Sequence, residues 1–316
     1  MRVIQNDDNN IEVNQTEYIE SIKSIEKIRK DDQKEPLDKK ENQQLRKAVG
    51  QLSWAQMSTR PDLAFDTLEM STNMQKGKLK DLKKAQKTIK KAKEKEIHVK
   101  FRRLGHWKNL HLEVYSDASW ATIENREKSV GGEMVFLVNE HSEATPLYWR
   151  SKTIRRVANN VKAAETMACF QAVDTGIAIS RQLHEIYTGQ PHNGHIPVDV
   201  FIDSEALEQS IYSSKQIEEK KLRTEIAGFK QNIADGDIRK VEWVSTNEMY
   251  ADLLTKNGVK PDLVIGTLSD GIIKRTNKQS NRIDKNPQTH RQSLQQVFTK
   301  LLNKQAKPMV SKLERV

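Results

Sequence analysis

The chain has 316 residues, of which 36% are hydrophobic, and this suffices for one domain with appendages or for two domains. No apolar run approaches the length of a membrane span, and the first thirty residues lack the basic start and apolar middle of a secretion signal. The single cysteine, Cys169, excludes an intramolecular disulfide. We therefore expect an intracellular protein that is neither secreted nor bound to a membrane.

The formal net charge of +10 is concentrated in two segments. Residues 76–103 contain 13 Lys or Arg and three acidic residues, and residues 273–316 contain 11 and two. Positive charge in segments of this kind fits contact with a polyanion such as nucleic acid. A solvated helix face and a disordered tail would explain the same charge, so charge alone does not assign a partner.

The first hundred residues show two patterns. Residues 1–40 are polar and poor in aromatic residues, so we expect a ragged or helical lead-in. From residue 45 to 95 the apolar spacing is helical, with an interruption at Arg60 and Pro61. The sequence therefore predicts a helical segment within residues 41–104.

From residue 105 the pattern becomes that of an α/β protein. Three strands spaced as an antiparallel meander precede a long helix, and two more strands follow, separated by helices. The predicted ranges are 110–116, 132–138 and 146–151 for the meander, 162–186 for the long helix, 198–203 and 240–244 for the later strands, and 216–234 for a charged helix between them. Ser245 and Glu248 have capping-box spacing and predict a last helix that runs through residue 256.

This order predicts a five-stranded mixed sheet, with three antiparallel strands and two parallel additions, flanked by helices. The predicted domain spans residues 105–262. Residues 263–316 have the composition of a basic, disordered tail.

Four acidic residues lie at positions that this topology would bring together. Asp117 ends the first strand and Asp203 the fourth, while Glu165 and Asp252 lie near the starts of the long helix and the last helix. Taken singly, such residues are usually turn, cap or solvated groups, so only the combination supports a site. Four converging carboxylates repel one another unless a cation compensates, and a set of oxygen ligands suits Mg²⁺ or Mn²⁺. Such a cluster is what a two-metal phosphodiester site requires.

The segments around these residues resemble a known family. YSDASWA, AAETMA, FIDSEAL and YADLLTK, in this order, are similar to the ribonuclease H (RNase H) domain of Ty1/copia-type retrotransposon Pol polyproteins. Upstream, LRKAVGQLSWAQMSTRPDLAFDTLEMST resembles the connecting segment that follows the polymerase in those polyproteins. The resemblance implies an RNase H-like fold and an endonuclease that cuts the RNA strand of an RNA/DNA hybrid with two Mg²⁺ ions, or with Mn²⁺ as a substitute. It places the catalytic and metal-binding set on Asp117, Glu165, Asp203 and Asp252.

The chain also departs from the wider family. The aspartate pair of a polymerase active site does not occur in the sequence, so we expect no polymerase activity from this chain and regard a separate polymerase portion as a candidate partner. Cellular RNases H have a histidine in the loop before the last helix, whereas this loop reads STNEMY. Asn247 and Glu248 are the candidates to take the place of that histidine.

The loop that leads to Glu165 contains four candidates for binding the hybrid backbone, because it is basic and close to the predicted metal site. They are Lys152, Arg155, Arg156 and Lys162. A catalytically inactive nucleic-acid-binding remnant is the alternative function, and the intact carboxylate set favours the nuclease. An integrase is excluded by residue order, because its glutamate follows the second aspartate, whereas residues 238–240 read Ile-Arg-Lys.

Overall fold

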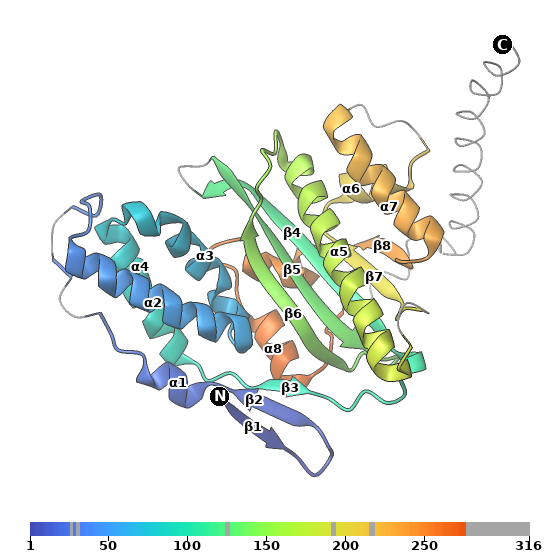
Figure 1. The fold of residues 1–316 in the computed structure, drawn as a ribbon, viewed down its shortest axis with the longest axis horizontal. Helices are drawn as coiled ribbons and strands as arrows, with labels where there is room; N and C mark the ends of the chain where they lie inside the picture. The colour runs from blue at the N-terminus through green and yellow to red at the C-terminus, as the bar shows by residue number, and fades with distance from the viewer. Residues whose placement is uncertain (26–27, 30–31, 124–126, 191–193, 215–218, 276–316) are drawn as a thin grey trace, which may run out of the picture.

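The computed structural model describes residues 1–25, 28–29, 32–123, 127–190, 194–214 and 219–275. Its centre is a five-stranded sheet in the order β6-β5-β4-β7-β8 (Figure 1). The strands are β4 (His111–Ile123), β5 (Lys128–Val138), β6 (Ala144–Thr153), β7 (Val198–Ile202) and β8 (Lys240–Trp243). β5 is antiparallel to β4 and β6, whereas β7 is parallel to β4 and β8. This sheet confirms the predicted α/β fold class, with three antiparallel strands and two parallel additions flanked by helices.

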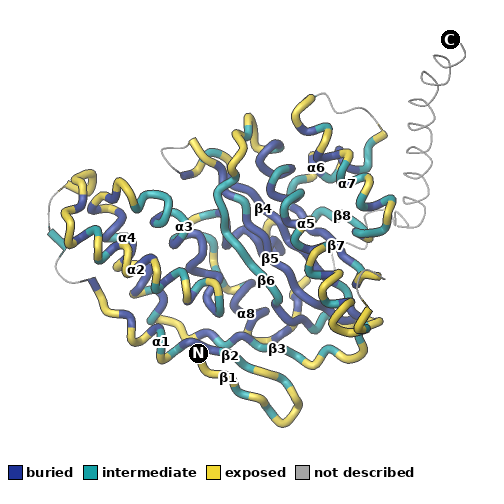
Figure 2. The backbone as a smooth tube through the Cα atoms, in the orientation of Figure 1, coloured by how far each residue is buried: buried dark blue, intermediate teal, exposed yellow. Residues whose placement is uncertain are grey.

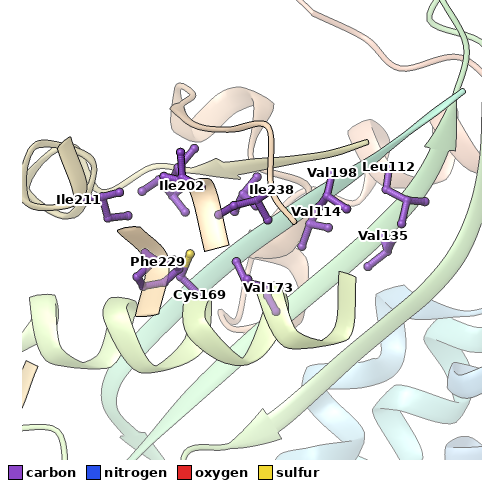
Figure 3. Close-up of a cluster of buried hydrophobic side chains, with 14 of the residues drawn as sticks. Leu112, Val114, Val135, Cys169, Val173, Val198, Ile202, Ile211, Phe229 and Ile238 are labelled. Carbon is purple, nitrogen blue, oxygen red and sulfur yellow. The ribbon is translucent and has the colours of Figure 1, made fainter. Parts of the chain in front are cut away.

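One face of the sheet is covered by the long helix. This helix, α5 (Val161–Thr188), packs against β4 and β5, and α6 (Glu205–Tyr212), η4 (Lys220–Leu222) and α7 (Arg223–Asp235) follow on from β7. Strand alternation directs Val114 and Val135 toward this layer, where they share a buried cluster with Cys169, Val173 and Phe229 (Figure 3). The only cysteine is therefore a core residue.

The opposite face packs against the segment that follows β8. This segment contains two 3₁₀ helices, η5 (Thr246–Glu248) and η6 (Tyr250–Leu254), and then α8 (Asp262–Asp270). Tyr115 and Phe136 point to this face, and their rings lie 4.7 and 5.2 Å from that of Tyr250. The predicted continuous last helix is wrong, because the chain becomes extended at the buried Met249 (ψ 96°) before η6 begins.

The predicted tail is wrong in its first part. α8 begins at residue 262, its residue Ile265 is buried, and Val264 and Leu268 share a buried cluster with residues of the sheet. Ile272 then forms a β-bridge with Glu143. The remainder of the predicted tail, residues 276–316, lies outside the described residues.

The predicted helical segment is present before the sheet. It comprises α2 (Lys39–Ser58), η1 (Pro61–Leu63), α3 (Ala64–Asn73), η2 (Met74–Lys76) and α4 (Leu79–Glu94). These helices share a buried apolar cluster that includes Leu45, Leu52 and Leu82. At the interruption between α2 and α3, buried Arg60 pairs with Asp62 at 2.9 Å.

The predicted ragged or helical lead-in is wrong for residues 2–14, which contain two strands. These are β1 (Arg2–Gln5) and β2 (Ile11–Asn14), and the short helix α1 (Thr16–Ser21) follows. β1 and β2 pair as a hairpin, and β2 also pairs with β3 (Val99–Phe101), which precedes the short η3 (Trp107–Asn109). In the described residues, no helix is both long enough and apolar enough to span a bilayer.

Candidate active site

Three aspartates from separate elements meet where β7 ends beside the middle of β4. Asp117 lies in β4, Asp203 directly follows the parallel strand β7, and Asp252 lies in η6. The register Ser116↔Ile202 places Asp117 and Asp203 at the same level of adjacent strands. One carboxylate oxygen of each aspartate lies within 4.8 Å of those of the other two. Asp117 and Asp252 are buried, and Asp203 is partly buried.

Glu165 lies beside this triad, near the start of α5. The helix is capped by Asn160, whose side chain accepts a hydrogen bond from the backbone N–H of Ala163 at 2.8 Å. Glu165 is buried one turn later. Burial, together with the negative charges of Asp117 and Asp203, raises the pKa of Glu165 to about 9. The structure thus brings all four predicted carboxylates into one electrostatic cluster.

The triad itself shows the same repulsion. Burial and the charge of Asp117 raise the pKa of Asp252 to about 6, although Lys256 opposes this shift. Burial and Asp117 also raise the pKa of Asp203. These carboxylates are therefore held close together at a cost in electrostatic energy, as expected where a bound cation normally compensates them.

Two residues after η6 complete the cluster, and the sequence analysis did not identify them. The ammonium group of Lys256 lies 3.2 Å from Oδ1 of Asp117 and 2.6 Å from Oδ1 of Asp252. The Thr255 hydroxyl donates a hydrogen bond to Oδ2 of Asp117. Although burial opposes it, the charge of Asp117 and the contact with Asp252 raise the pKa of Lys256. The spacing of Asp252 and Lys256, four residues apart, was the available signal.

Close packing against β5 holds η6 at the site. Gly132 lies opposite Asp117 in the sheet. A Cβ at Gly132 would lie 2.7 Å from Cγ2 of Thr255 and 2.8 Å from Cβ of Leu254. η6 can therefore approach the strand, and bring Asp252 to Asp117, because this position has no side chain.

The four basic residues predicted to bind nucleic acid differ in their surroundings. Arg156 forms an ion pair with the buried carboxylate of Glu225 in α7. Burial and the charges of two neighbouring arginines lower the pKa of Lys152. Within the described part of the chain, the exposed Arg155 and the partly exposed Lys162 form no ion pair. Arg155 and Lys162 are thus the two that remain available to a phosphate backbone.

Asn247 and Glu248, the two candidates to take the place of the loop histidine, differ in their exposure to solvent. Glu248 is buried, and one of its oxygens accepts a hydrogen bond from the Ser245 hydroxyl at 3.0 Å. Asn247 is exposed. Glu248 therefore stabilises the turn between β8 and η6, and Asn247 is the one open to solvent.

The donor set suits a hard divalent cation. All four acidic residues offer only oxygen atoms, and three of them already have an oxygen within 4.8 Å of one another. Lys256 contributes a single positive charge to four carboxylates, so negative charge remains to be compensated. A cluster of buried oxygen ligands with excess negative charge fits cations such as Mg²⁺ and Mn²⁺.

Comparisons with known proteins find similarity among solved structures alone. No protein-family model and no curated protein matches the sequence. The structure is similar to LC11-RNase H1, isolated from compost by a metagenomic approach, with 16% identity, a TM-score of 0.34, and coverage of 46% of this chain and 92% of that chain. It is also similar to RNase H1 from the halophilic archaeon Halobacterium salinarum NRC-1, with 17% identity, a TM-score of 0.33, and coverage of 46% of this chain and 94% of that chain.

A viral protein is also similar. For the prototype foamy virus protease-reverse transcriptase, the identity is 15% and the TM-score 0.30, over 54% of this chain and 22% of that chain. LC11-RNase H1 has also been crystallised in complex with an RNA/DNA hybrid. Similarity at these identities and TM-scores assigns no activity to this chain.

Proposed function

We propose that this chain is a retrotransposon-derived RNase H of the Ty1/copia type, which hydrolyses the RNA strand of an RNA/DNA hybrid. The observation that carries this proposal is the convergence of Asp117, Asp203 and Asp252 within 4.8 Å, with Glu165 beside them. The Ty1/copia origin is supported by the motifs that contain these residues, from YSDASWA to YADLLTK.

The four carboxylates would hold two Mg²⁺ ions, or Mn²⁺ in their place. Such ions, when bound, stabilise negative charge on a reacting phosphodiester and activate water. The strand-borne aspartates fix the position of the site, because the hydrogen-bonded pairing of β4 with β7 sets their separation. Lys256 pairs with both Asp117 and Asp252 and offsets part of their negative charge.

The substrate would reach this site past the loop that leads into α5. Arg155 and Lys162 would contact the phosphate backbone there, with Lys152 beside them. Arg156 would contribute less, because its guanidinium group is already paired with Glu225.

Cleavage of a labelled RNA/DNA hybrid by the purified chain tests this proposal. We expect Mg²⁺- or Mn²⁺-dependent cutting of the RNA strand alone, and Asp203→Asn should reduce the rate to below about 1% of wild type by removing a cation ligand. Asp262→Asn is the matched control, because the Asp262 side chain is 77% exposed at the start of α8.

If the wild-type chain binds the hybrid but does not cut it with either ion, the nuclease proposal fails. The chain would then be a catalytically inactive nucleic-acid-binding remnant. Equal activity in wild type and Asp203→Asn would also contradict the assigned site.

A further inference from the structure

Helix α4 contributes six lysines to one groove at the surface of the helical segment. This groove, here called the α4 groove, has a volume of about 890 Å³. Its basic residues are Lys80, Lys83, Lys84, Lys87, Lys90 and Lys91. Asp66 and Glu94 are the acidic residues of its lining. Figure 2 shows that α4 alternates between buried and exposed residues, as expected for a helix that covers a core with one face.

The acidic residues of the groove are engaged by half of the lysines. Lys84 and Lys91 both pair with Asp66, at 3.1 and 3.3 Å. Lys90 lies 3.8 Å from Glu94. The two carboxylates are therefore already compensated by three of the six ammonium groups.

The other three lysines supply free positive charge. Lys80, Lys83 and Lys87 form no ion pair with any residue in the described ranges. Spacings of three and four residues place them along one side of the helix. From Lys80 to Lys87 the helix advances about 10 Å at about 1.5 Å per residue, and duplex DNA carries one charge per about 1.7 Å of its axis. A row of this length fits an extended polyanion rather than a single compact anion.

The α4 groove begins beside the candidate active site. Asn257 and Gly258 line it, and they directly follow Lys256, which contacts Asp117 and Asp252. The Asn257 amide also donates a hydrogen bond to Glu69 of α3 at 3.3 Å. This contact ties the segment after η6 to the helical segment, so one end of the groove lies next to Lys256 in the chain.

We propose that the α4 groove binds the phosphate backbone of the same RNA/DNA hybrid, beyond the part that lies at the carboxylates, through Lys80, Lys83 and Lys87. This inference rests on the proposed function for the identity of the ligand. It assigns a partner to the basic segment 76–103, whose charge alone left that partner open.

Hybrid binding measured in EDTA tests the groove without requiring hydrolysis. The triple variant Lys80→Ala/Lys83→Ala/Lys87→Ala of the full chain is compared with wild type by fluorescence anisotropy of a labelled hybrid over a range of salt concentrations. The logarithm of the binding constant should depend less steeply on the logarithm of salt, by about 2 to 3 in slope, because each lost phosphate contact removes about 0.9. Affinity at moderate salt should fall about 10- to 100-fold.

A matched triple variant controls for net charge. Lys39, Lys40 and Lys47 are exposed on α2, and Lys39→Ala/Lys40→Ala/Lys47→Ala removes the same three charges. It should bind like wild type, and circular dichroism verifies that both variants are folded. If hybrid binding weakened equally in the two variants, the proposal that the α4 groove binds the hybrid would be wrong, because the effect would then follow net charge.

The failure of this inference can be told apart from the failure of the proposed function. If wild type cuts the RNA strand and the α4 variant binds the hybrid unchanged, the groove is wrong and the nuclease stands. If wild type does not cut but the α4 variant alone loses hybrid binding, the groove stands as a nucleic-acid surface and the nuclease is wrong.

Discussion

Glu165 shows how the candidate site couples chemistry to stability. Its carboxyl has a pKa raised from 4.5 to about 9, and that of Asp252 is raised from 3.8 to about 6. A raised pKa means that the folded protein binds these protons more tightly than the unfolded chain does. The contribution of these groups to stability is therefore present below about pH 4 and is lost as the pH rises through 6 and toward 9. Ionised carboxylates at the site destabilise the metal-free fold.

Replacing Glu165 by its neutral isostere should reverse this effect. In EDTA at pH 8, Glu165→Gln should increase the free energy of unfolding by about 1 to 3 kcal/mol, because the wild-type carboxyl is ionised in the unfolded chain and must take up a proton on folding, whereas glutamine is already neutral. The gain should shrink at pH 5, where the carboxyl of the unfolded chain is itself close to its pKa and partly protonated. Urea unfolding at the two pH values measures it. Glu185→Gln, at an exposed position of the same helix, should change stability by less than about 0.5 kcal/mol. A loss of stability at pH 8 in Glu165→Gln would refute the electrostatic account.

At the level of single residues, the four acidic residues of the site could be predicted from the sequence, whereas Lys256, which pairs with two of them, could not. Asp203 follows its strand as predicted, but the predicted end of the first strand at Asp117 is wrong, because β4 continues to Ile123. The two aspartates still meet, because the parallel pairing of β7 with β4 stops at Ile202 and Ser116. Lys256 could not be placed, since a lysine four residues after an aspartate is usually a solvated partner on a helix surface. Its contact with Asp117 depends on how η6 packs against β4, and local sequence does not encode that distance.

The position of η6 depends on the absence of a side chain at Gly132. We expect Gly132→Ala to lower the free energy of unfolding by about 1 to 3 kcal/mol, because the new Cβ would lie 2.7 Å from Thr255 and 2.8 Å from Leu254. Displacement of η6 should also weaken cleavage, since Asp252 moves with it. Denaturant unfolding and the hybrid-cleavage assay measure the two effects.

At Gly50, in contrast to Gly132, there is room for a side chain. It lies inside α2, and a Cβ there would have no neighbour within 4 Å. Gly50→Ala should therefore stabilise the chain by about 0.5 to 1 kcal/mol through helix propensity alone. If Gly132→Ala were as stable as Gly50→Ala, close packing between β5 and η6 would not determine where Asp252 lies.

Elements were predictable where their pattern is local. The five strands of the central sheet and α5 follow from alternation and from helical spacing over long segments. The end of the last helix could not be predicted. The capping-box spacing of Ser245 and Glu248 describes one turn, and it does not show that the backbone becomes extended at Met249. The strands β1 and β2 were missed because β3, which pairs with β2, lies at residues 99–101.

For the molecule as a whole, the buried core crosses the boundary predicted at residue 105. Ala64 of α3 and Val99 of β3 belong to the same buried cluster as Tyr115 of β4. Phe65 packs with Ile123 and Val130 at the end of the sheet. Figure 1 shows α3 beside the sheet and β3 below it. The change of motif at this point in the sequence is therefore not a boundary between independent cores.

A second contact joins the helical segment to the sheet. The indole N–H of Trp149 in β6 donates a hydrogen bond to the backbone carbonyl of Gln56 in α2 at 2.6 Å. Trp149 thus lies where the two parts meet, and its fluorescence should report on their separation.

The two parts should consequently unfold together. We expect the full chain to show a single thermal transition, with the same midpoint by far-ultraviolet circular dichroism and by tryptophan fluorescence. A fragment of residues 105–275 should melt at least about 10 °C lower, because it exposes the apolar surface that now covers Ile123 and Val130. Two separate transitions in the full chain, or an unchanged midpoint for the fragment, would contradict a shared core. A shared core would hold the α4 groove in a fixed position relative to the carboxylates, and a hybrid held at both places requires that position to be fixed.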